Sequence, residues 1–67
     1  MMALSGDHCS IDFSTLDLRG STLSGTFLDC DFRACDLRGA RLIGTFVDCD
    51  FTGAIMDSTT RRTGRFL

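Results

Sequence analysis

The sequence lacks seven residue types altogether: Glu, Lys, Asn, Gln, Pro, Trp and Tyr. Without Glu, Lys and Gln, few residues remain that favour the surface of a helix, so a helical protein is not expected. The formal net charge is −2, whereas a nucleic-acid-binding domain usually has a basic excess. No apolar run approaches the ~18 residues of a transmembrane helix, and no signal-peptide pattern is visible. We expect a single small domain in the cytoplasm, with no membrane partner and no direct nucleic-acid binding.

Residues for catalysis and metal binding are also scarce. The only histidine is His8, and the four cysteines include no C-x-x-C pair, so a zinc site is not expected. No phosphate-binding loop or nucleophile elbow is present. We interpret His8 beside Cys9 as a packing pair, and we expect neither enzyme activity nor a cofactor.

The sequence is a tandem repeat. Residues 21–39 match residues 40–58 at eight of 19 positions and residues 2–20 at nine of 19. The chain therefore divides into three 19-residue units, at 2–20, 21–39 and 40–58, followed by a tail at 59–67. Repeats of this kind indicate stacked structural units.

Within each unit, large apolar residues recur every five residues, with one four-residue step. The series includes Phe13 and Leu18 in the first unit and continues with Leu23 in the second. This period fits neither a helix nor a flat strand. It predicts a chain that turns a corner about every five residues, with glycines near the corners where backbone freedom is needed.

The segments CDFRA, CDLRG, CDFTG, IDFST and LDLRG resemble the motif of the pentapeptide-repeat family. The resemblance covers residues 2–58 and implies an all-β fold, a right-handed quadrilateral β-helix of three short coils. It also implies that the central Leu or Phe and the small residue two before it point inward. The 19-residue coil departs from the regular 20-residue coil of the family.

Residues 19 apart should then stack in columns along the coils. We expect interior columns of Phe13, Phe32 and Phe51, of Leu18, Leu37 and Met56, and of Leu4, Leu23 and Leu42. The short step allows two registers: Phe27 and Phe46 inward, or Leu28 and Val47 inward. We favour the phenylalanines, although this register places His8 rather than Cys9 inside the first coil.

The cysteines fit the same scheme. Cys30 and Cys49 should be neighbours in one inward column, and Cys35 should point inward on the next side. Four cysteines in a short chain also allow a disulfide framework. We favour free buried thiols that act as small apolar groups.

The outward positions carry an uneven charge. Two adjacent sides hold six acids, including Asp7, against Arg33, a net charge of −5, and the tail adds three arginines, Arg61, Arg62 and Arg65. The next side has Asp17, Asp36 and Asp57 against Arg19 and Arg38, and the last side has Arg41. These acids could simply follow the family pattern, in which Asp or Asn commonly precedes the central residue. Stacked like charges repel, however, and neutral Asn would serve at these positions, so we favour a function for the charge. The predicted protein-binding surface, which we call the acidic ridge, consists of Asp12, Asp17, Asp29, Asp31, Asp36, Asp48 and Asp50.

Rows of carboxylates on a regular rod can imitate the phosphate rows of duplex DNA. Some members of the family act on DNA gyrase in this way, but three coils are short for a topoisomerase DNA gate. The sequence looks like a small phage anti-CRISPR member of the family. That resemblance implies an inhibitor that acts in the cytoplasm of a bacterial host cell, where it occupies the DNA-binding site of a Cascade-type CRISPR effector. The alternatives are a structural or oligomerisation module and a gyrase modulator.

The ends of the stack could cap or dimerise. Phe66 and Leu67 could fold over the last coil or dock on a second copy, and family members often dimerise through the C-terminal end. Outward Ile43 and Ile55, with Leu28 and Val47, could form a modest apolar patch for such a contact, but we favour the alternative that they are scattered surface residues.

Overall fold

The computed structural model describes residues 2–67 and contains strands and turns but no helix in that range. The strands are short and all pair in parallel. They form a three-stranded sheet in the order β1-β3-β5 and a four-stranded sheet in the order β2-β4-β6-β7. The bounds are β1 Ala3–Leu4, β2 Asp7–Cys9, β3 Thr22–Leu23, β4 Thr26–Leu28, β5 Arg41–Leu42, β6 Thr45–Val47 and β7 Arg65–Phe66.

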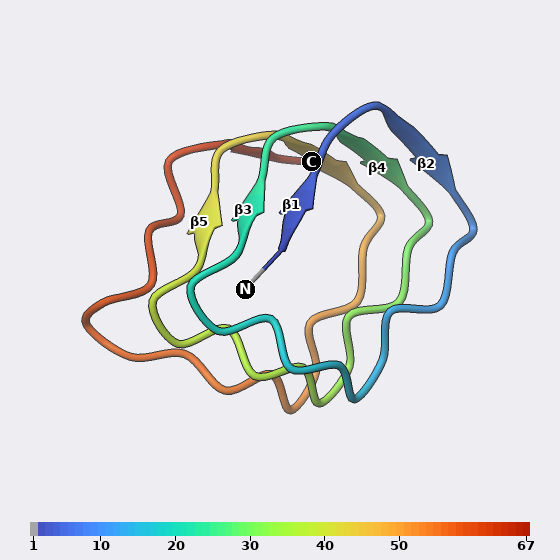
Figure 1. Ribbon diagram of the computed structural model, residues 1–67. Helices are drawn as coiled ribbons and strands as arrows, with labels where there is room; N and C mark the ends of the chain where they lie inside the picture. The colour runs from blue at the N-terminus through green and yellow to red at the C-terminus, as the bar shows by residue number, and fades with distance from the viewer. Residues whose placement is uncertain (1) are drawn as a thin grey trace.

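The chain winds as a β-solenoid of about three turns (Figure 1), so the predicted all-β fold is confirmed. Residues 19 apart are partners in both sheets, for example Ala3 with Thr22. The first and second sides of each coil belong to these two sheets. Single bridges join the coils on the other two sides, through Asp12, Asp31 and Asp50 on the third and through Asp17, Asp36 and Ile55 on the fourth.

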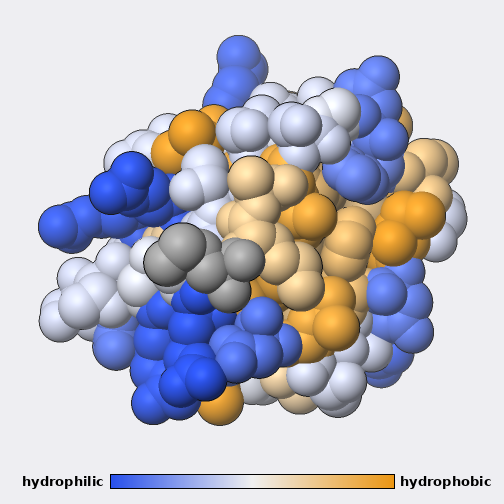
Figure 2. All heavy atoms as spheres, in the orientation of Figure 1, coloured by the Kyte–Doolittle hydropathy of each residue, from blue (hydrophilic) through white to orange (hydrophobic). Residues whose placement is uncertain are grey.

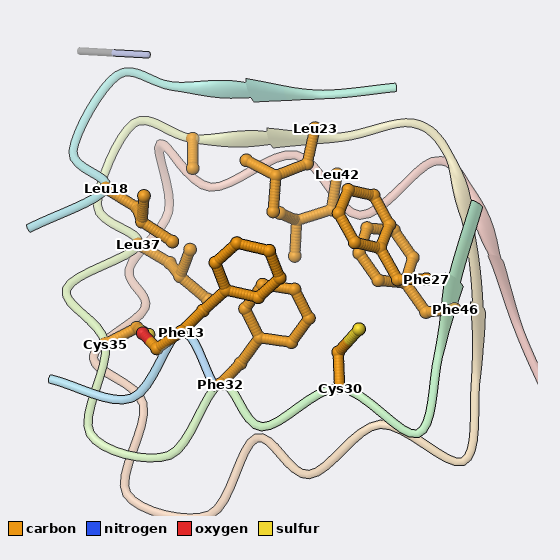
Figure 3. Close-up of a cluster of buried hydrophobic side chains, with 11 residues drawn as sticks. Phe13, Leu18, Leu23, Phe27, Cys30, Phe32, Cys35, Leu37, Leu42 and Phe46 are labelled. Carbon is orange, nitrogen blue, oxygen red and sulfur yellow. The ribbon is translucent and has the colours of Figure 1, made fainter. Parts of the chain in front are cut away.

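The interior is filled by columns of apolar side chains (Figure 3). Phe27 and Phe46 are 0% and 1% exposed, whereas Leu28 is 40% exposed, so the favoured register is confirmed. The first coil follows it, because His8 stacks on Phe27 with ring centroids 5.0 Å apart. A second aromatic column, Phe13, Phe32 and Phe51, meets the first edge to face. Both stacked and edge-to-face arrangements are favourable for aromatic rings.

Two kinds of corner explain the glycines and the shortened coil. At Gly39 and Gly53 the φ angles are +72° and +73°, in the left-handed region that glycine enters easily. Gly44 has another role: a Cβ there would lie 2.1 Å from the carbonyl oxygen of Gly25. A Cβ at Gly25 would lie equally close to the carbonyl oxygen of Gly6. The four-residue step thus brings successive coils so near at this corner that only glycine fits.

The last residues continue the solenoid by half a coil. Arg61 bridges Arg41, and β7 pairs with β6, both at a spacing of 20 residues. Phe66 stacks on Phe46 and extends the aromatic column, with ring centroids 4.9 Å apart. The third and fourth sides have no further coil above them within residues 2–67, so the C-terminal end of the stack is a step.

The molecule measures 26 × 20 × 19 Å. In Figure 2, apolar atoms are visible in the middle of the face, within the outline of the first coil, and hydrophilic residues surround them. Nothing within residues 2–67 forms a helix that could cross a membrane.

Candidate functional site

Five of the seven aspartates in the acidic ridge lie on the third side and at the corner before it, and the other two, Asp17 and Asp36, lie on the fourth side. Asp12, Asp31 and Asp50 are bridge partners in successive coils, so they form one column. Asp29 and Asp48 occupy the preceding corner, each with a φ of 53°. Successive coils are separated by about 4.8 Å, the spacing of hydrogen-bonded strands. The carboxylates therefore stand in two parallel rows.

The aspartates of this column also stabilise the turns that follow them in the chain. The Oδ1 atom of Asp31 accepts a hydrogen bond from the backbone N–H of Arg33 at 2.9 Å, and Asp50 does the same for Thr52. Asp12, Asp17, Asp36 and Asp57 repeat this contact with the residue two positions later. Such Asx turns can be made by Asp or Asn, because the amide oxygen of Asn accepts the same bond. The turns therefore require an oxygen acceptor but not a negative charge.

One arginine partly neutralises the third side. The guanidinium of Arg33 lies 2.7 Å from the carboxylate of Asp31 and 4.0 Å from that of Asp50. Its side-chain hydrogen bonds, with the backbone bond, hold the pKa of Asp31 below its ordinary range. Hydrogen bonds from Ser14 lower the pKa of Asp12, and those from Thr52 lower the pKa of Asp50. All three carboxylates are thus held in the charged form.

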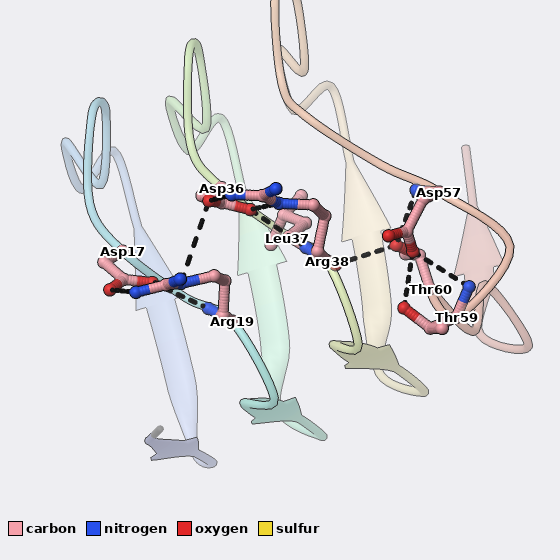
Figure 4. A network of polar contacts seen from close by, with 8 residues as sticks. All are labelled: Asp17, Arg19, Asp36, Leu37, Arg38, Asp57, Thr59 and Thr60. Carbon is pink, nitrogen blue, oxygen red and sulfur yellow. Dashed lines mark hydrogen bonds and ion pairs between the residues drawn. The ribbon is translucent and has the colours of Figure 1, made fainter.

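The fourth side is a ladder of ion pairs rather than an acidic surface (Figure 4). Arg19 contacts Asp17 at 2.8 Å and Asp36 of the next coil at 3.8 Å, and Arg38 pairs with Asp36. The Arg19 hydrogen bonds lower the pKa of Asp17, and those of Arg38 lower the pKa of Asp36. A recurring D-x-R pattern at residues 17–19, 31–33 and 36–38 carries this pairing in the sequence. The net charge of each side does not reveal this pairing.

The corner aspartates differ from the rest of the ridge. Asp29 and Asp48 are exposed, and neither makes an ion pair with any residue in the range 2–67. Their left-handed backbone favours Asp, Asn or Gly, and Ser10 takes the same conformation in the first coil. The backbone explains a small polar residue at this corner, but it does not explain the charge.

The four outward apolar residues considered for a patch do not gather on one side of the solenoid. Ile43 and Ile55 are each 48% exposed, but Ile43 directly follows β5 and Ile55 is the bridge partner of Asp36 on the fourth side. Leu28 and Val47 belong to the second side, in β4 and β6. Leu28 and Val47 are partners in neighbouring coils, but Ile43 and Ile55 lie elsewhere around the coil, so the four residues do not share one side.

The C-terminal step contains an open hollow of about 480 Å³, which is lined by Phe51, Met56, Arg62 and Phe66. It arises because the half coil covers only the first and second sides. Phe66 is 43% exposed and Leu67 is 70% exposed. Phe66 therefore caps Phe46 on one face and is open to solvent on the other.

Three of the four thiols belong to the core or pack against it. Cys30 and Cys35 are buried, Cys49 is half-buried and Cys9 is exposed. The Sγ of Cys35 donates to the Phe13 carbonyl at 2.8 Å, and burial raises the pKa of the Cys35 thiol. The Nε2 of His8 lies 2.8 Å from the carbonyl oxygen of Ser5. The Sγ of Cys30 lies 3.6 Å from the carbonyl oxygen of His8, so His8 packs in the first coil.

The structure thus belongs to the class of β-solenoids with a four-sided coil. Comparison with known families agrees, since residues 29–60 match the family model described as pentapeptide repeats, in 8 copies. Proteins of this repeat class are protein-interaction modules with a generally non-catalytic fold. No curated protein and no solved structure matches the chain.

Proposed function

We propose that this interaction module is an acidic DNA mimic that binds and blocks the DNA-binding site of a nucleic-acid-handling complex. The observation that carries the proposal is the corner pair Asp29 and Asp48. These carboxylates are outward, exposed and one coil apart, and no residue in the range 2–67 neutralises them. Neither the corner nor the neighbouring Asx turns need the charge, because Asn would satisfy both.

The density of charge supports the same proposal. Three coils place their first and last carboxylate rows about 10 Å apart, at about 4.8 Å per coil. Duplex DNA carries about six phosphate charges over that length of axis. The third side and its corner carry five carboxylates in the same span: Asp12, Asp29, Asp31, Asp48 and Asp50. Basic side chains that bind the phosphates of a short stretch of duplex could therefore bind these carboxylates instead.

The short ridge favours a small target site. About 10 Å of charged surface suits a pocket that reads a few base pairs, whereas a topoisomerase gate needs a longer rod. We infer that the target is a Cascade-type CRISPR effector and that the inhibitor prevents target DNA recognition, as an anti-CRISPR does. The ion-paired Asp17 and Asp36 belong to the flank of this contact, because Arg19 and Arg38 offset their charge.

An affinity capture tests the proposal. The wild-type chain and a D29N/D48N variant are immobilised, exposed to lysate containing a Cascade-type effector, and washed with duplex DNA. We expect the wild type and the control to retain the effector and to release it in the presence of the DNA, and we expect D29N/D48N not to retain it. A D7N/D57N variant is the matched control, since it removes the same number of charges at positions outside the acidic ridge. Equal retention by all three chains would contradict the proposal.

A second candidate function is an oligomerisation module, favoured by the hollow beside Phe66. Docking two such ends would cover Phe51 and Met56, and end-to-end copies would reach the length needed by a gyrase modulator. This candidate predicts an oligomer that Phe66→Ser disrupts and that the aspartate variants do not affect. Size-exclusion chromatography with light scattering, together with a supercoiling assay, separates it from the first proposal.

A further inference from the structure

The C-terminal half coil contains arginines that make no ion pair within residues 2–67. Arg19, Arg33 and Arg38 each pair with an aspartate of their own chain. Within residues 2–67, no ion pair and no side-chain hydrogen bond involves the other four arginines, which are Arg41, Arg61, Arg62 and Arg65. Arg61 lies one coil above Arg41 as its bridge partner, so two like charges are stacked. This cluster would be stabilised by an acidic partner.

The same half coil ends in an open strand edge. β7 is the last strand of its sheet, and Arg65 and Leu67 donate their N–H groups to Gly44 and Phe46. Because alternate residues of a parallel strand bond to opposite neighbours, Phe66 directs its N–H and C=O away from β6. Such an edge is a template for one more strand.

The side-chain columns indicate which residue types such a strand must contain. An added residue above Phe66 would point inward, against the hollow formed with Phe51 and Met56. The residue before it would point outward above Arg65, which continues the outward column of Thr26 and Thr45. The matching sequence is therefore an acidic residue followed by a large apolar one.

We propose that the β7 edge is a second binding surface, which adds an extended acidic segment of a partner protein as a further strand, its acid against Arg65 and its apolar side chain over Phe66. The opposite end of the solenoid has the reverse charge, because Asp7 stands at the first position of the Arg65 column. The two ends therefore select different segments. This surface lies apart from the acidic ridge and does not depend on the function proposed for it.

A peptide titration tests the proposal. The blocked peptide Ser-Ser-Asp-Phe-Ser-Ser is added to the ¹⁵N-labelled protein, and amide shifts are followed by NMR. We expect saturable shifts at residues 44–47 and 61–67, and none from a peptide with Lys in place of Asp or Ser in place of Phe. Arg65→Glu should weaken binding roughly fivefold, as expected for loss of an exposed ion pair. Arg19→Glu, the same charge change on the first coil, should have little effect.

Three results would overturn the proposal. The first is the absence of saturable shifts at the β7 edge, or shifts confined to the ridge. The second is equal weakening by Arg65→Glu and Arg19→Glu. The third is a different occupant: tighter binding of a duplex oligonucleotide at the same residues, or shifts there that depend on protein concentration alone and so report a second copy. Thermal unfolding followed by circular dichroism confirms that both variants are folded.

Discussion

The ring of Phe46 lies 4.8 Å from that of Phe27, and the two planes are 5° apart. Each ring belongs to a different coil, so this stack joins residues 19 positions apart in the sequence. The same arrangement continues from His8 to Phe66. A small solenoid has no large globular core, and its stability comes from contacts between neighbouring coils.

Replacing Phe46 with Ala should therefore remove much of the stability. Truncation of a buried Phe costs about 3–5 kcal/mol. A chain of this size has roughly 3–10 kcal/mol in total, at 0.05–0.15 kcal/mol per residue. Urea unfolding should show a large fall in midpoint for Phe46→Ala and a small one for Leu28→Ala, whose side chain is outward. Equal shifts would contradict the observed register.

Gly44→Ala should destabilise the protein through a clash between coils. The new Cβ would lie 2.1 Å from a backbone oxygen of Gly25, which no side-chain movement can relieve. We expect a cost of about 1–3 kcal/mol or more, typical of forced backbone shifts. Gly53→Ala is the matched control, because Ala34 already occupies the equivalent corner with a φ of 57°. Thermal unfolding should rank Gly44→Ala well below Gly53→Ala.

The protein should lose stability in acid. Hydrogen bonds lower the folded-state pKa of the turn aspartates Asp12, Asp17, Asp31, Asp36, Asp50 and Asp57. Their contribution is fully present above the unfolded value of about 3.9 and is lost as the pH falls through the lower folded values. The free energy of unfolding should be flat from about pH 5 to 8 with respect to these groups. A steady decline over that range on moving toward pH 5 would contradict this assignment.

Asn and Ala substitutions at Asp31 should separate the turn from the charge. Asp31→Asn keeps an oxygen for the Arg33 N–H, whereas Asp31→Ala leaves that N–H without its partner. We expect the melting temperature to fall more for Ala than for Asn, by several degrees. Equal melting temperatures would show that the carboxylate oxygen does not support the turn.

Much of the fold could be predicted from the repeat, because a fixed period places every central residue in a column. The orientation of Phe27 and Phe46 followed from treating the four-residue step as a compressed repeat. The close approach at Gly44 could not be predicted, since it depends on where the coils lie relative to one another. The half coil could not be predicted either, because the step from Met56 to Arg62 is six positions instead of five and an arginine stands where the repeat has an apolar residue.

The ridge was predicted as a charge pattern, and its positions follow from the repeat. What the pattern did not reveal is which charges are already satisfied. Pairing of Asp17 with Arg19 is visible only as a D-x-R spacing, which acquires meaning once a turn brings both side chains to one face. Asp29 and Asp48 remain as the charges that the fold does not use.

The central claim is tested most directly by the concentration of protein that halves duplex DNA binding to a Cascade-type effector. The account predicts inhibition by the wild type that weakens steeply as salt is raised. It predicts loss of inhibition in a folded variant with Asn at Asp12, Asp29, Asp31, Asp48 and Asp50. Equal inhibition by that variant would contradict the claim that the ridge acts through its charge.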